Sequence, residues 1–93
     1  MNRQNEMLSI IYDILQEQYA VPCNKLEPNL SINRELGIDG DDAYELIEFL
    51  VNKTGKKPSF DFSRYFYGEG ILQISGRENL SVLELSLVFS EVN

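Results

Sequence analysis

The segment 39–55 most constrains the fold, because it joins a helical pattern to a start signal and a stop signal. Asp39 is a residue type that caps helix N-termini, and Gly55 is the type that most often ends helices. Between them, the apolar residues form one narrow stripe when each residue turns the helix by about 100°. The stripe consists of Ala43, Leu46, Ile47, Leu50 and Val51. The pattern predicts a long amphipathic helix that starts near Asp39.

Two further segments have helical patterns. Residues 3–19 repeat apolar side chains at helical spacing, and the following Ala20-Val21-Pro22 ends the pattern. Its apolar face consists of Leu8, Ile11, Tyr12, Leu15 and Tyr19, widened by Ile10 and Ile14. Ser81-Val82-Leu83-Glu84 matches a capping box, so we expect the last helix to open at Ser81. The apolar side of that helix continues with Leu85, Val88 and Phe89.

The remaining segments read as connections. Residues 22–35 contain two prolines and predict a long connection, anchored in the core by Leu26, Leu30 and Ile32. The aromatic run 60–67 favours a short helical turn whose rings fill the core, and Gly68 to Gly70 favours a turn. Residues 71–74 fit either a loop or a short extended piece. The predicted fold is therefore all-α, a single domain over residues 1–93 with three main helices plus one short helix.

The chain is acidic, with a net charge of −7 over 93 residues. This charge disfavours nucleic acid, whose binding needs a basic face, and it disfavours anionic membrane surfaces. No apolar run is long enough to suggest a membrane span. An acidic domain suits a protein partner with a basic patch, because complementary charge speeds encounter. We therefore expect a cytoplasmic monomer that binds neither nucleic acid nor membrane.

Catalytic and metal chemistry find little support in the composition. The chain has no histidine, which removes the commonest general base and most zinc sites, so we do not expect an enzyme. Cys23 is the single cysteine, so it forms no internal disulfide and reads as a small loop or core residue. The acids at 39–42 lack the closing glutamate of a calcium loop, whose place is taken by Leu50. No cofactor and no metal are expected.

Residues 35–46, around the start of the second predicted helix, resemble the acyl carrier protein family. In that family the stretch reads roughly Leu-Gly-x-Asp-Ser-Leu, and the serine hydroxyl carries a phosphopantetheine arm. Leu36, Gly37 and Asp39 match this pattern, whereas Gly40 and Asp41 stand where the family has serine and leucine. The order of the predicted helices is also similar to that of the family. More narrowly, residues 36–43 and 60–66 resemble a group of uncharacterised bacterial carrier-like proteins in which an acidic turn replaces the serine.

The resemblance implies an acyl-carrier-protein-like bundle without carrier chemistry, because the side chain of Gly40 offers no oxygen to modify. It nominates an acidic docking face on the second helix that consists of Asp39, Asp41, Asp42, Glu45 and Glu48. On this hypothesis, an acid at 41 or 42 mimics the charge of the missing phosphate. The same acids also have an ordinary explanation as helix caps and as a solvated face. The sequence leaves these explanations open.

Two other functions stay open at this point. The chain is a working carrier if a displaced serine is modified, and the available serines are Ser31 in the long connection and Ser63 in the aromatic run. Neither serine has the Asp-Ser-Leu setting. Alternatively, the chain is a structural or inhibitory subunit with one stoichiometric partner.

Overall fold

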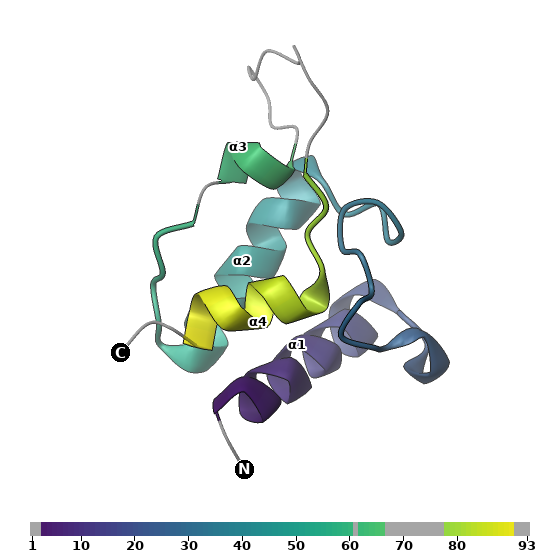
Figure 1. Ribbon diagram of the computed structural model, residues 1–93, viewed down its shortest axis with the longest axis horizontal. Coiled ribbons are helices and arrows are strands. Elements are labelled where there is room, and N and C mark those ends of the chain that lie inside the picture. Colours follow the sequence, from purple (N-terminus) through teal and green to yellow (C-terminus); the bar gives the residue numbers. More distant parts are fainter. Residues whose placement is uncertain (1–2, 61, 67–77, 91–93) are drawn as a thin grey trace.

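Three long helices and one short helix build the protein, which we describe from a computed structural model over residues 3–60, 62–66 and 78–90. Figure 1 shows α1 (Arg3–Tyr19), α2 (Gly40–Thr54), α3 (Phe62–Tyr65) and α4 (Val82–Ser90), with a 3-10 turn, η1 (Cys23–Lys25), in the first connection. These residues form a compact, mostly helical domain and contain no β-strand, so the prediction of a helical fold with three long helices is confirmed. Tyr67, the expected turn at 68–70 and the ambiguous segment 71–74 lie outside the described residues.

The boundaries of α2 follow from the two signals in its sequence. Asp39 is the N-cap, in an extended conformation, and its carboxylate accepts a hydrogen bond from the Gly40 N–H at 2.8 Å. Gly55 ends the helix with φ 71°, a left-handed conformation that glycine adopts without strain. Its N–H donates to the Val51 carbonyl at 2.8 Å. Both predicted ends of this helix are confirmed.

The end of α1 is also where the sequence predicts it, after Tyr19. Ala20 turns the chain with φ 55°, and the Val21 N–H donates to the Leu15 carbonyl at 3.1 Å. The buried face of the helix is shifted from the predicted one, because Met7 is buried whereas Leu8 is only partly buried. Both α4 and α2 pack against α1, so they determine which side of its apolar face is covered.

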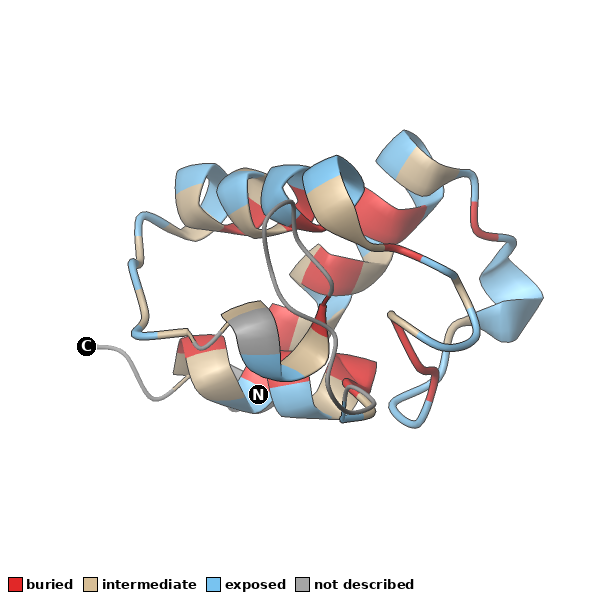
Figure 2. Cartoon of the chain, turned by 90° about the horizontal axis from the view of Figure 1, so that it is seen from above, coloured by how far each residue is buried: buried red, intermediate tan, exposed pale blue. Residues whose placement is uncertain are grey.

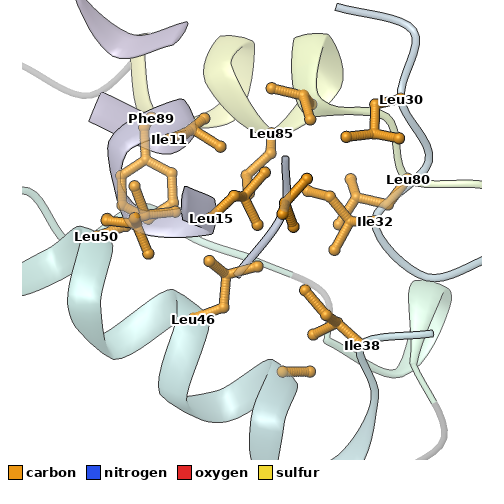
Figure 3. Close-up of a cluster of buried hydrophobic side chains, with 14 of the residues drawn as sticks. Ile11, Leu15, Leu30, Ile32, Ile38, Leu46, Leu50, Leu80, Leu85 and Phe89 are labelled. Carbon is orange, nitrogen blue, oxygen red and sulfur yellow. The ribbon is translucent and has the colours of Figure 1, made fainter. Parts of the chain in front are cut away.

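One hydrophobic core lies between the three long helices, and Figure 2 shows their buried residues on the sides that face one another. The long connection completes the core: Leu30 and Ile32 are buried as expected, and so is Ile38, whereas Leu26 is only partly buried. Figure 3 shows the side chains that meet at the centre, from α1, α2, α4, the connection and the segment before α4: Ile11, Leu15, Leu46, Leu50, Leu85, Phe89, Leu30, Ile32, Ile38 and Leu80.

The long connection is fixed to the segment that precedes α4. Ser31 and Ser81 form an isolated antiparallel β-bridge, in which the Ile32 N–H donates to the Leu80 carbonyl at 2.8 Å. Ser81 is also the N-cap of α4, since its hydroxyl accepts the Glu84 N–H at 3.1 Å, as the capping-box pattern predicts. The sequence pattern contained no signal for the bridge, because it pairs residues that are far apart in the chain.

Asn33 joins three segments through its side chain, and we call this set of contacts the Asn33 clamp. Its Nδ2 donates to the Tyr65 carbonyl at 2.8 Å and to the Glu78 carbonyl at 2.7 Å. Its Oδ1 accepts the Leu80 N–H at 3.1 Å. Arg64 also forms an ion pair with Glu78, and both of these side chains are largely exposed. The clamp therefore holds α3 in place relative to the connection that leads into α2.

Candidate functional site

The outer face of α2 carries a line of acidic side chains, which we call the acidic ridge: Asp41, Glu45 and Glu48. All three are exposed. At about 100° per residue they lie within one narrow strip of the helix surface, away from the buried strip of Ala43 and Leu46. Within residues 3–60, 62–66 and 78–90, no lysine or arginine lies at ion-pair distance from these carboxylates. The ridge is therefore an exposed strip of negative charge.

The other two acids that the sequence nominated lie beside the ridge and not on it. Asp39 is partly buried and caps the helix through its own carboxylate. Asp42 is exposed, but it lies about 100° around the helix from Asp41. Its backbone carbonyl accepts a hydrogen bond from the Tyr19 hydroxyl at 2.9 Å, which places this part of α2 against the end of α1.

Tyr19 is held in its neutral form at this junction. The pKa of Tyr19 is raised to about 12, first by burial and then by the negative charges of Glu45 and Asp42. A phenol with a raised pKa keeps its proton at neutral pH, so it continues to donate to the Asp42 carbonyl.

Gly40 is the first residue of α2 and has φ 57°. A Cβ added to it would meet no atom within 4 Å, so the position is open in space. The left-handed conformation is nevertheless strained for residues with a side chain. The backbone therefore favours glycine here for conformational reasons, and a serine at the same place would be strained.

A groove runs along the outer side of α2, next to the acidic ridge, and its volume is about 490 Å³. We call it the α2 groove. One wall comes from α2, and the other comes from the start of α3 and from the connection before it, which returns alongside α2 (Figure 1). The wall from α2 consists of Tyr44, Ile47, Glu48 and Val51. The opposite wall consists of Lys57, Pro58, Phe60 and Phe62.

Stacked aromatic rings join the two walls of the α2 groove and connect them to the core. The rings of Tyr44 and Phe62 lie 3.9 Å apart between centroids and are nearly parallel, with an angle of 9°. Phe62 in turn contacts Phe66 at 5.0 Å, and Phe66 is fully buried. Tyr44 itself is 55% exposed. The aromatic run thus fills the core, as predicted, but it also presents a fixed apolar surface to solvent.

Sequence reasoning missed this groove. The sequence predicted that the rings of the aromatic run, Phe60 and Phe62 among them, fill the core. The one available signal was that Ile47 and Val51 widen the apolar stripe of α2 beyond what one packing surface covers. They are only partly buried, since they lie on the groove side of the helix.

The remaining candidates from the sequence have defined positions. Ser31 is buried, its hydroxyl donates to Asn33 Oδ1 at 3.1 Å and it accepts the Arg34 N–H at 3.1 Å. Such a hydroxyl is poorly placed for modification. Ser63 lies in α3, and Cys23 is exposed in η1. Among the side chains described, no cluster of His, Cys, Asp and Glu is arranged to hold a metal ion.

None of the described helices is both long and apolar enough to cross a membrane. Comparisons of the chain with protein-family models, with curated proteins and with solved structures find no match.

Proposed function

We propose that this chain is an acyl-carrier-protein-like binding domain that carries no phosphopantetheine arm and docks a basic protein surface onto α2. The docking face consists of the acidic ridge, with Asp39 and Asp42 beside it. The domain has no catalytic role of its own in this proposal. The observation that carries it is the exposed ridge on the outer face of α2.

Stabilisation of the helix start explains the presence of only some of these acidic residues. Asp41 and Asp42 lie in the first turn of α2, where a negative charge stabilises the helix through its dipole. That effect fades beyond the first turn, so it does not account for Glu45 or Glu48. These two extend the negative strip along the helix. A charged strip of this kind raises the rate of encounter with a basic partner and sets its orientation.

The absence of the arm is supported by the residue and by its backbone. Gly40 stands where the resemblance places the modified serine, and its φ of 57° disfavours a side chain. The burial of Ser31 makes a displaced attachment there unfavourable. An intact-mass measurement after incubation with a phosphopantetheinyl transferase and coenzyme A tests this point. We expect no change in mass, and a gain of one arm would overturn it.

A charge-reversal experiment tests the docking face. Glu45→Lys/Glu48→Lys reverses the outer end of the ridge, whereas Asp13→Lys/Glu17→Lys makes the same change in net charge on exposed positions of α1. Immobilised wild type and both variants are compared for the proteins they retain from native cells, identified by mass spectrometry. We expect proteins that the wild type and the α1 variant retain, that the α2 variant loses, and that elute by about 0.5 M salt, because salt screens such contacts.

The same experiment can also contradict the proposed docking face. If both double variants retain the same proteins as the wild type at low salt, the ridge is a solvated face and the proposal is wrong. Because all four substituted positions are exposed, each variant should keep its helicity and unfold within about 0.5 kcal/mol per substitution of the wild type. Circular dichroism and urea unfolding check this before any capture is compared.

A further inference from the structure

The α2 groove and the acidic ridge share one residue, and this juxtaposition defines what the groove can hold. Glu48 belongs to the ridge and also lines the groove. Glu45 lies one helical turn nearer the start of α2, on the ridge alone. The remaining α2 wall is apolar, through Tyr44, Ile47 and Val51. A strip of negative charge therefore runs along one side of an apolar hollow.

We infer that the α2 groove takes a bulky aliphatic or aromatic side chain from a basic, amphipathic protein segment whose lysines or arginines lie on the acidic ridge. This inference rests on the proposed function and specifies the chemistry of the partner. A buried anchor side chain surrounded by charged contacts is how many protein interfaces are built. Lys57, on the opposite wall, disfavours basic residues there, so the basic side of the segment should face the ridge.

The groove is suited to such an anchor because it exists before binding. The Tyr44 ring of one wall is stacked on Phe62 of the other, and Phe62 contacts the fully buried Phe66, so both walls are connected to the core. A preformed wall loses little conformational freedom when a side chain binds. The volume of about 490 Å³ has room for a large side chain together with part of its backbone.

Charge distinguishes this occupant from two others. A second copy of the chain also carries a net charge of −7, and close association of two such copies is opposed by repulsion. A fatty acid or another anionic amphiphile could pair its charged group with Lys57, but it would leave the acidic ridge without a partner and would be repelled by Glu48 on the other wall. A segment that is both apolar and basic satisfies the groove and the ridge together.

A random peptide library displayed on phage and selected on the whole protein at low salt provides the probe. We expect the enriched peptides to combine several lysines or arginines with one bulky apolar residue. The tightest peptide is then synthesised with that residue intact and with it replaced by alanine. We expect the alanine peptide to bind roughly 10- to 100-fold more weakly by calorimetry, because burial of one such side chain is lost.

Two variants separate the groove from the ridge. Val51→Trp fills the groove without changing charge, and it should reduce binding of the parent peptide to the level of the alanine peptide. Glu45→Lys changes the ridge without lining the groove, and it should weaken both peptides by a similar factor. Tyr44→Ala removes the exposed wall and serves as a second groove variant. Circular dichroism confirms that each variant is folded.

The outcomes assign failure to one proposal or the other. If the alanine peptide binds as tightly as its parent while Glu45→Lys weakens both, the groove inference is wrong and the docking ridge stands. If Val51→Trp abolishes binding while Glu45→Lys and salt have no effect, the proposal that the acidic ridge is a docking face is wrong. Enrichment of peptides without basic residues overturns the inference. So does dimerisation of the wild type that Val51→Trp removes, seen by sedimentation, because the occupant would then be a second copy.

Discussion

The two faces of α2 differ in almost every physical property although they belong to the same fifteen-residue helix. On the inner face Ala43, Leu46 and Leu50 have no exposed surface. On the outer face Tyr44 is 55% exposed, and the ridge acids are exposed as well. The inner face stabilises the fold through burial, whereas the outer face contributes little burial and presents charge next to an apolar groove.

This contrast teaches that stability and surface recognition can be altered separately in this protein. A substitution on the inner face removes contacts within the core, so it should change the free energy of unfolding. A substitution on the ridge changes the field that a partner meets and leaves the core intact. Four substitutions examine how far this separation extends.

Leu46→Ala should produce the largest loss of stability, because it leaves a cavity in the centre of the core. We expect the free energy of unfolding to fall by about 2–5 kcal/mol, as measured by urea unfolding. The matched outer-face change Glu48→Ala should alter it by no more than about 0.5 kcal/mol. Similar losses of stability for the two variants would show that the inner and outer faces of α2 contribute equally to stability.

Asn33→Ala should have the next largest effect, although Asn33 lies outside the helices. It removes the clamp between the connection, α3 and the segment before α4, and leaves carbonyl and N–H groups without their partners. We expect a loss of about 1–3 kcal/mol. Asn29→Ala, at an exposed position of the same connection, is the control. A loss no greater than that of the control would mean that the clamp adds nothing to stability.

Gly40→Ala tests whether an open position can still be intolerant of change. No atom would contact the new Cβ, but φ is 57°, so we expect a loss of about 1–2 kcal/mol from backbone strain alone. Gly40→Asn should be less harmful, because asparagine tolerates the left-handed conformation better than alanine does. Thermal unfolding compares the stabilities of the two variants. If alanine is the less harmful of the two, strain is not the cause.

Tyr19→Phe should give the smallest effect at neutral pH, and its effect on stability should change with pH in the alkaline range. The pKa of Tyr19 is raised from 10.0 to about 12 in the folded protein, so the unfolded chain loses the proton first as pH rises. The stabilisation by the neutral phenol is complete below pH 10.0 and is lost as pH approaches 12. The stability advantage of the wild type over the variant should therefore shrink over this interval.

Urea unfolding of both proteins at a series of pH values measures this difference. Other titrating groups are common to the two proteins and largely cancel in the comparison. An advantage that stays constant up to pH 12 would show that the folded and unfolded chains ionise alike at this residue.

Local signals in the sequence were enough to place the helices. Each of these signals acts on neighbouring residues. They are Pro22 after the first helix, Asp39 and Gly55 at the ends of α2, and the capping box at Ser81. The conformations that they favour are therefore largely independent of the rest of the chain. The acids of the ridge could also be found from the sequence, since their common strip follows from helical geometry.

The features that join distant segments could not be found in this way. Nothing near Asn33 in sequence indicates that it reaches the carbonyls of Tyr65 and Glu78. The bridge between Ser31 and Ser81 is equally non-local. The shift of the buried face of α1 toward Met7 depends on where α4 and α2 pack, which no pattern within α1 records.

By itself, then, the sequence determined which segments are helical, where they begin and end, and that α2 carries negative charge beside a residue with no side chain. The tertiary structure alone decided that the connection after α2 returns along its outer side and that Phe62 stacks on Tyr44, which joins the two walls of the α2 groove. The physical reason is range. Caps and helical periodicity act within a few residues, whereas a groove needs two walls whose relative position is fixed only when the whole core packs.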